Sequence, residues 1–299
     1  MPKVDKRKYL KPEMVARLNN MSLRARMVVE GYIIGHHKSP YHGFSVEFAE
    51  HRAYGPGDEV RHIDWKLYGK TDRYYVKRYE EETNLRSYLI LDTSKSMTYA
   101  SGSISKLDYA SYLTAALSYL MLSQQDGIGL VLFDEKIQQF IPPRSTPGHL
   151  NTVLSQLDHI NPGSDTKLGP VLHEMAERIK KRGLVVLISD LFDDPNAVLG
   201  GLKHFRHNKQ EVIIFHILDR QELEFEFNTR TRFKDIETGE LITTEPWQIR
   251  SSYRSLVEQF QASYRKRCRK RQMDYIPLFT DQDLDLALNE YLRKRQKLG

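Results

Sequence analysis

The sequence predicts an α/β protein with a doubly wound, mostly parallel sheet, an N-terminal helix plus a small β segment, and a β-hairpin insertion. Two observations predict the sheet. Short apolar runs alternate with amphipathic stretches of helical length from residue 85 onward, as in consecutive βαβ units. Polar residues directly follow several of these runs, as they do where loops leave the carboxyl ends of parallel strands. The insertion is predicted from a break in this alternation at residues 221–249, around the hairpin signal Glu-Thr-Gly-Glu at 237–240.

The N-terminal segment is predicted to begin with a helix at residues 12–34. Pro12 suits a first helical turn, and apolar residues recur at approximately helical spacing after it. Strands are expected at 44–48 and 74–79, with the Gly-Pro-Gly-Asp turn signal between them. We therefore divide the chain into residues 1–84, packing on the main domain, and a main domain of residues 85–299.

The main domain is predicted to alternate strands and helices. Its first part is strand 87–91, helix 106–124, strands 127–133 and 136–141, helix 147–157, helix 169–181, strand 184–189, helix 195–207 and strand 211–218. After the insertion at 221–249 we expect helix 251–272, strand 275–279 and helix 284–297. No internal repeat or low-complexity linker interrupts this order.

Composition is that of an ordinary globular protein, with 299 residues of which 40% are hydrophobic and 28% charged. No apolar stretch approaches 18 residues, so we expect no membrane span. The basic N-terminus is not followed by the apolar core of a signal peptide. The single cysteine, Cys268, cannot form an internal disulfide. A cytoplasmic location is the simplest expectation.

The chain is basic, with a formal net charge of +6 and a pI near 9.1. The excess gathers at residues 3–26, 264–271 and 293–297. Such clusters can bind nucleic acid, but more often they are solvated helix faces or contact an acidic protein. We expect no nucleic-acid binding; steep salt dependence of DNA binding would identify it.

Oxygen-bearing side chains follow two apolar runs and line one Gly-bounded turn of the main domain. They are Asp92, Ser94 and Ser96 in an Asp-x-Ser-x-Ser sequence, Thr166 in the turn, and Asp190 after the later run. Because parallel strands end at one edge of a sheet, these side chains should converge there. Hard oxygen donors favour Mg²⁺, with Mn²⁺ or Ca²⁺ as alternatives, over zinc.

An alternative interpretation needs no metal. Ser94 and Ser96 could cap the helix that follows them, and Asp190 could cap another. Capping alone, however, does not require all three loops to carry oxygen ligands.

The five residues resemble the metal-ion-dependent adhesion site of von Willebrand factor A domains, which have a Rossmann-type sheet. That family combines an Asp-x-Ser-x-Ser loop, a Thr in a Gly-rich loop and an Asp at the end of a later strand. The resemblance implies that Asp92, Ser94 and Ser96 hold Mg²⁺ (a MIDAS), that Thr166 joins on partner binding, and that Asp190 binds through water. It also implies that an acidic side chain of a partner completes the metal coordination.

A second motif lies before the main domain. Its residues are Arg52, Gly57, Asp58, Arg61, Asp64 and Trp65, in a block that contains Gly-Asp-x-x-Arg-x-Ile-Asp-Trp. This block resembles the signature of a bacterial family, domain of unknown function 58, whose genes commonly neighbour MoxR-type AAA+ ATPases. The block is either a contact surface for a partner or a structural lock. In the lock, arginines pair with aspartates and Trp65 anchors the segment.

Together, these resemblances imply a non-enzymatic, Mg²⁺-dependent protein-binding adaptor. Its expected partners are a MoxR-type AAA+ ATPase and a client protein that offers an acidic side chain to the metal. The alternative is a metal-dependent hydrolase or phosphatase that uses the same carboxylates. Against this alternative, the sequence shows no general base or anchored nucleophile beside them, and no phosphate-binding glycine loop.

Overall fold

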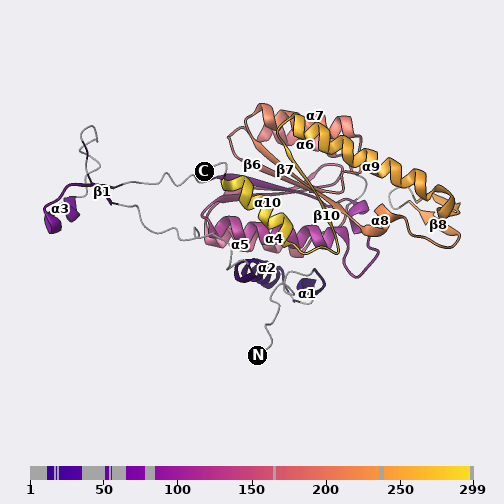
Figure 1. Ribbon diagram of the computed structural model, residues 1–299, viewed down its shortest axis with the longest axis horizontal. Coiled ribbons are helices and arrows are strands. Elements are labelled where there is room, and N and C mark those ends of the chain that lie inside the picture. The colour runs from indigo at the N-terminus through magenta and orange to yellow at the C-terminus, as the bar shows by residue number, and fades with distance from the viewer. Residues whose placement is uncertain are drawn as a thin grey trace. The chain divides into compact units, whose positions relative to one another are not determined.

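The computed structural model of the chain describes residues 12–16, 18, 20–35, 51–53, 55, 65–77, 85–163, 166–235 and 239–296. Residue contacts divide it into two compact units (Figure 1). The larger unit contains residues 1–38 and 85–299, and the smaller unit contains residues 39–84. The sequence had grouped residues 1–84 together, whereas the N-terminal helices belong with the sheet.

A six-stranded sheet lies at the centre of the larger unit. Its strand order is β10-β7-β6-β3-β4-β5, and the neighbouring pairs are parallel except β4 with β5. The strands are β3 (Arg86–Asp92), β4 (Gly127–Phe133), β5 (Ile137–Arg144), β6 (Leu184–Ser189), β7 (Glu211–Leu218) and β10 (Asp274–Phe279). The predicted α/β class with a mostly parallel sheet is confirmed.

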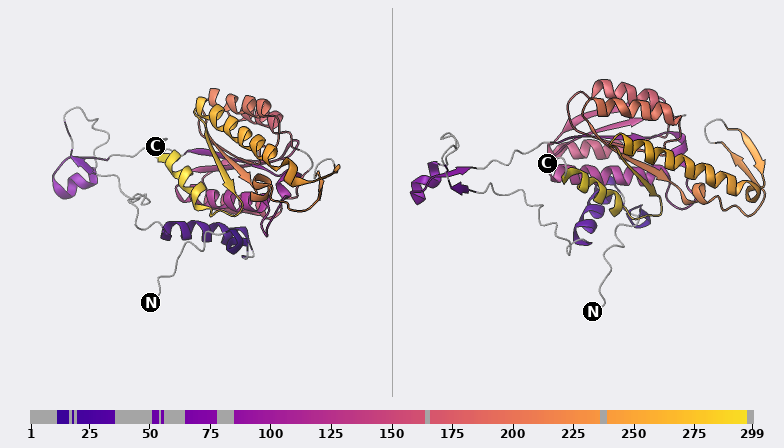
Figure 2. Two further views of the ribbon diagram at one scale, coloured as in Figure 1. Left: turned by 45° about the vertical axis from the view of Figure 1, so that its right-hand side comes forward. Right: turned by 45° about the horizontal axis from the view of Figure 1, so that its top comes forward.

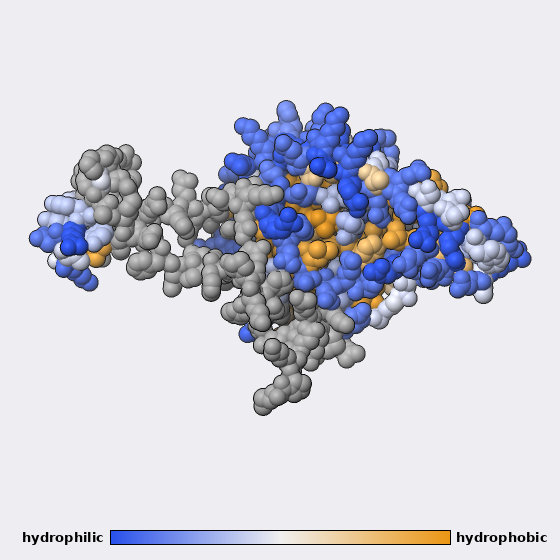
Figure 3. Space-filling view, in the orientation of Figure 1, coloured by the Kyte–Doolittle hydropathy of each residue, from blue (hydrophilic) through white to orange (hydrophobic). Residues whose placement is uncertain are grey.

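Helices cover both faces of the sheet (Figures 1 and 2). On one face lie α4 (Lys106–Ser123), α5 (Pro147–Asp158) and α10 (Asp285–Gln296). On the other lie α6 (Leu168–Arg178), α7 (Pro195–His207) and α9 (Pro246–Lys270). The central strands are therefore buried on both sides, which explains why they appear in the sequence as continuous apolar runs. In Figure 3, apolar residues reach the surface between α9 and α10, and hydrophilic residues surround them.

The helix predicted at residues 12–34 is in fact two helices. They are α1 (Pro12–Ala16) and α2 (Met21–Gly35). The Asn20 side chain accepts a hydrogen bond from the Leu23 N–H (2.8 Å), which is the geometry of an N-cap and starts a new helix at that point. Val28 and Val29 of α2 are buried, and α2 packs on α4 and α5. This apolar contact explains why the N-terminal helices belong to the larger unit.

The insertion after β7 consists of a short helix and a hairpin. These are α8 (Arg220–Glu224), β8 (Thr231–Lys234) and β9 (Leu241–Thr244), with β8 and β9 antiparallel. Phe225 stacks on Tyr253 of α9, with ring centroids 4.3 Å apart. Helix α9 begins before the predicted residue 251 because Pro246 occupies its first turn, where a missing N–H costs nothing.

The smaller unit contains an antiparallel pair, β1 (His51–Ala53) and β2 (Tyr75–Lys77), and helix α3 (Trp65–Thr71). Arg52 lies opposite Val76 in this pair. Trp65 is 57% exposed and meets the Tyr68 ring edge-on.

Several predictions for this region fall outside the described residues. They are the strand at 44–48 and the signature residues Gly57, Asp58, Arg61 and Asp64. The choice between a contact surface and a lock therefore stays open. Among the helices that the structure describes, none combines the length and apolar character that a bilayer crossing requires.

Candidate functional site

Asp92 is the last residue of β3 and is fully buried beside the end of β6. Its carboxylate accepts two hydrogen bonds. The Ser94 N–H donates to Oδ1 (3.0 Å) and the Ser189 hydroxyl donates to Oδ2 (2.6 Å). Ser189 was not among the predicted site residues, although its position at the end of a neighbouring parallel strand could have suggested it. The two strand ends thus hold a buried carboxylate with neutral donors.

The two serines of the Asp-x-Ser-x-Ser sequence point toward one another. Their Oγ atoms lie 3.1 Å apart, and Ser94 makes no side-chain capping bond to the short 3₁₀ helix (Lys95–Thr98) that follows it.

The capping alternative is wrong for Ser94, Ser96 and Asp190. Helix α4 is capped by Ser105, in a capping box with Asp108. Helix α7 is capped by Asp194. The three predicted ligands are therefore not used to start these helices.

Asp190 lies directly after β6 and is paired with a cationic side chain of the protein, Lys106. The Lys106 ammonium lies 2.9 Å from Asp190 Oδ2 and 2.8 Å from Glu222 Oε1. The side chains of Lys106 and Asp190 are each only 4% exposed. The Phe192 N–H also donates to Asp190 (3.3 Å). Asp190 is thus paired with Lys106 at the start of α4, and Lys106 also pairs with Glu222 of α8.

The sequence analysis missed both Lys106 and Glu222. A weak signal for Lys106 existed, because a lysine in the first turn of a helix opposes the helix dipole and calls for a compensating anion. Glu222 is the capping-box residue of α8. Its contact with Lys106 spans 116 residues of sequence, so no local pattern predicts it.

The pKa values of the two aspartates move in opposite directions. Burial raises the pKa of Asp92 to about 7, and the negative charge of Asp190 adds to the rise. Burial also opposes ionisation of Asp190, but the adjacent Lys106 ammonium outweighs it and lowers the pKa of Asp190. A hydrogen bond from Ser96 contributes to this lowering. Asp190 is therefore neutralised by Lys106, whereas no lysine or arginine of the described part of the chain is paired with Asp92.

The loop that carries Thr166 is fastened to the Asp92 loop by its backbone. The Gly163 N–H donates to Thr93 O (2.8 Å), and the Thr93 hydroxyl donates to Phe133 O at the end of β4 (2.8 Å). A side chain at position 163 would overlap Asp134, so this close approach requires glycine. Thr93, which is not among the predicted site residues, therefore joins three loops.

Thr166 itself forms no hydrogen bond with any described residue. Its hydroxyl oxygen is buried and lacks a partner. The structure thus connects Asp92, Ser94, Ser96 and Asp190 through hydrogen bonds and charge. Thr166 lies on an adjoining loop, and its hydroxyl is not hydrogen-bonded to any of these four residues. Buried hydroxyls without partners are uncommon and call for an explanation such as an ion or water.

The chemistry of these donors fits a hard divalent cation next to Asp92. The donor set is one carboxylate and up to three hydroxyls, which Mg²⁺ accepts together with water. Within the described ranges, no group of three or more His, Cys, Asp or Glu side chains is arranged for a metal.

Comparison with known proteins identifies the family. Residues 50–263 match the family described as "Protein of unknown function DUF58". This chain belongs to that family. Uncharacterized proteins of Mycobacterium bovis (Mb1516) and Mycobacterium tuberculosis (Rv1480) are 25% identical to it over 231 residues, covering 76% of this chain and 72% of each relative. The family predicted from the signature block is confirmed.

Solved structures share the fold of this DUF58 chain. An aerotolerance-related membrane protein from Bacteroides fragilis matches 70% of this chain and 99% of its own, with a TM-score of 0.50 and 17% identity. The VWA domain of SpRpn10 matches 70% of this chain and 95% of its own, with a TM-score of 0.42 and 11% identity. The predicted α/β fold with a mostly parallel sheet is confirmed, and these likenesses concern the fold alone.

Proposed function

We propose that this DUF58 protein is a non-enzymatic, Mg²⁺-dependent protein-binding adaptor. It works in the cytoplasm with a MoxR-type AAA+ ATPase, in the assembly or remodelling of client proteins. The partner offers an acidic side chain to the site at Asp92. The family resemblance supports the ATPase partner by association, and the geometry of the site supports the mode of binding.

The observation that carries the proposal is the unequal state of the two strand-end carboxylates. Asp190 already has the Lys106 ammonium, whereas Asp92 is fully buried among neutral donors. Burial without a counter-charge is unfavourable for a carboxylate. A bound cation would offset the cost of burying the Asp92 carboxylate, and the Thr166 hydroxyl, which has no hydrogen-bond partner among the described residues, could coordinate it.

Each residue has a defined part in this proposal. Asp92, Ser94 and Ser96 would hold the ion, and Ser189 would orient Asp92 through its hydrogen bond. Thr166 would join when a partner binds, and Asp190 would act through water because Lys106 engages its Oδ2 atom. When bound, Mg²⁺ supplies an open coordination position that a carboxylate can fill.

A binding experiment with purified components tests the proposal. The full chain would be titrated against the MoxR-type ATPase of the same organism, in Mg²⁺ and in EDTA. We expect wild type to bind only in Mg²⁺ and Asp92→Ala to bind in neither. Asp274→Ala is the matched control, because Asp274 begins β10 and so lies at the opposite edge of the sheet.

Two results would overturn the proposal. Equal binding by wild type and Asp92→Ala in EDTA would place the interface elsewhere and remove the role of the metal. Mg²⁺- or Mn²⁺-dependent turnover of a phosphoester panel, abolished by Asp92→Ala, would establish the hydrolase instead.

A further inference from the structure

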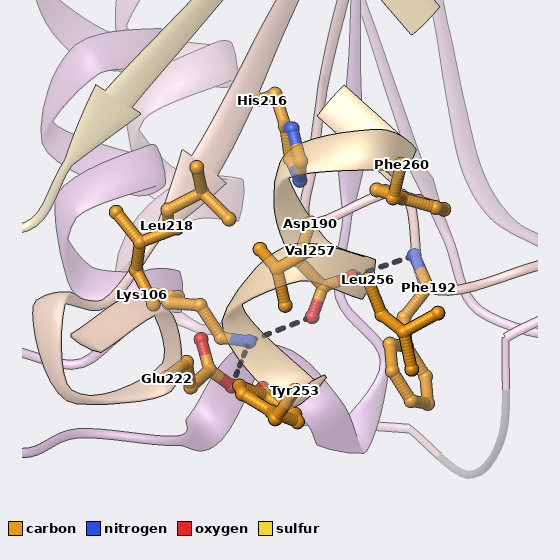
Figure 4. A pocket seen from close by; sticks show the side chains of 11 residues that line it. Lys106, Asp190, Phe192, His216, Leu218, Glu222, Tyr253, Leu256, Val257 and Phe260 are labelled. Atoms are coloured by element: carbon orange, nitrogen blue, oxygen red, sulfur yellow. Dashed lines mark hydrogen bonds and ion pairs between the residues drawn. The ribbon is translucent and has the colours of Figure 1, made fainter. Parts of the chain in front are cut away.

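A pocket opens next to Asp190, at the same edge of the sheet as the Asp92 site. Its volume is about 310 Å³, at the small end of ligand-binding cavities. Helices α8 and α9 and the end of β7 form its walls (Figure 4). The apolar lining consists of Leu218, Leu223, Tyr253, Leu256, Val257 and Phe260.

The charged side chains and the histidine that line the pocket already have partners. Lys106 bonds both Asp190 and Glu222, as the dashed lines in Figure 4 show. The ring of His216 is paired through Nδ1 with the Tyr275 hydroxyl (2.6 Å). An occupant therefore gains little from polar contacts and most from covering the apolar walls.

The rim of the pocket is apolar as well. Phe192 is 71% exposed and Leu256 is 64% exposed, and both belong to the pocket lining. Large exposed apolar side chains gathered around a cavity are typical of a surface that a partner covers. The volume, at the lower limit for small-molecule sites, is large enough for one or two side chains.

The net charge of the pocket determines which kind of partner side chain can enter it. Asp190, Glu222 and Lys106 together carry one excess negative charge, so an added carboxylate is repelled from the pocket. A cation at Asp92 attracts that carboxylate instead. Asp190 borders both places, since it directly follows β6, the strand paired with β3, and it lines the pocket.

We propose that the pocket binds a large apolar side chain of a partner segment whose acidic residue occupies the Asp92 site. The recognised chemistry is an Asp or Glu followed within one to three residues by Phe, Leu or Met. A short spacing is expected because Asp190 borders both places and an extended chain advances about 3.3 Å per residue. This inference rests on the proposed function and names the partner chemistry for the same site. It also gives α8 and α9, which wall the pocket, a role in specificity.

Synthetic peptides test the proposal on the full chain. The probes are Gly/Ser peptides with one Asp and with Phe one, two or three residues later, followed by methyl NMR titration in Mg²⁺. For the best spacing, we expect replacement of Phe by Ala to weaken binding at least about ten-fold, from the apolar area no longer buried. We expect replacement of Asp by Asn to weaken the binding of both the Phe peptide and the Ala peptide.

Variants of the chain assign the effect to the pocket. Leu256→Ser at the rim and Val257→Phe, which fills the cavity, should abolish the preference for Phe over Ala. Leu241→Ser is the matched control, because Leu241 is 56% exposed on β9 and is not part of the pocket lining. It should keep the preference.

The outcomes separate this inference from the proposed function. If Phe and Ala peptides bind equally but need both Asp and Mg²⁺, the adaptor site stands and the pocket inference is overturned. If the Phe peptide binds equally with Asn for Asp and in EDTA, the metal-site proposal fails and so does the linked partner motif. Absence of binding by every peptide at millimolar concentration overturns both.

Discussion

Two carboxylates at adjacent strand ends of one sheet have opposite environments. Asp190 after β6 has a lysine ammonium at 2.9 Å, and its pKa is lowered although burial opposes this. Asp92 at the end of β3 has only neutral donors, and burial raises its pKa to about 7. Among the described residues, the protein thus supplies a cation to Asp190 and none to Asp92, and in the proposed function a bound ion takes that second place.

The largest effect is expected at the built-in cation. Lys106→Met keeps an apolar stem but removes the counter-charge of buried Asp190 and of partly buried Glu222. We expect the free energy of unfolding, measured by urea denaturation in EDTA, to fall by about 3–5 kcal/mol. The double variant Lys106→Met with Asp190→Asn should recover part of this loss. If Lys106→Met alone were as stable as wild type, Lys106 would not stabilise Asp190, and the proposed difference between Asp190 and Asp92 would be wrong.

The next effect concerns the position without a protein cation. Asp92→Asn removes a buried carboxylate that no cationic side chain among the described residues neutralises. Its unfolding free energy in EDTA should therefore fall far less than that of Lys106→Met. Wild type should gain about 2.7 kcal/mol when Mg²⁺ is present at a hundred times its dissociation constant. Asp92→Asn should gain nothing. Thermal unfolding with and without Mg²⁺ measures this, and equal gains would contradict a metal site at Asp92.

A smaller effect is expected where the Thr166 loop meets the Asp92 loop. Gly163→Ala places a methyl group against Asp134, which Gln138 holds through two 2.7 Å contacts. We expect a loss of about 1–3 kcal/mol of stability from this overpacking, together with weaker partner binding in Mg²⁺. Gly148→Ala is the control, since a side chain there meets no neighbour within 4 Å. If Gly163→Ala and Gly148→Ala bound the partner equally well, the Thr166 loop would have no part in partner binding.

The smallest effect comes from an ion pair at the opposite end of β7. Burial raises the pKa of Glu211, but hydrogen bonds from Lys294 (2.7 Å) and Arg206 (2.8 Å) outweigh it and lower that pKa. Because this pKa is lower in the folded than in the unfolded protein, ionised Glu211 stabilises the fold at pH values above the unfolded pKa near 4.5. This stabilisation is lost as the pH falls below 4.5 and through the folded-state pKa.

Glu211→Gln should therefore cost about 1 kcal/mol at pH 7 and progressively less as the pH is lowered below 4.5. Urea denaturation across this range checks the sign. This pair serves as the comparison for the Lys106 cluster, because it is more exposed and lies away from the site. A cost that grew as the pH fell would show that the charge of Glu211 does not stabilise the fold.

Local patterns predicted much of the fold. The central strands are buried on both faces, so each appears as an apolar run, and the polar residue that ends it is visible at once in the sequence. The division of the first helix at Asn20 was missed, since an N-cap within an approximately periodic stretch resembles an ordinary surface residue. The assignment of residues 1–38 to the larger unit was also missed, because it depends on α2 packing against α4 and α5.

By itself, the sequence determined the class of sheet, the family and the order of oxygen donors along the chain. These follow from periodicity and from motifs of fewer than ten residues, which the backbone expresses locally. Only the tertiary structure decided that Lys106 neutralises Asp190 and not Asp92, a contact across 84 residues. It also decided that α8 and α9 enclose a pocket beside that pair. Such contacts depend on how helices from distant parts of the chain pack over the strand ends, which no local pattern encodes.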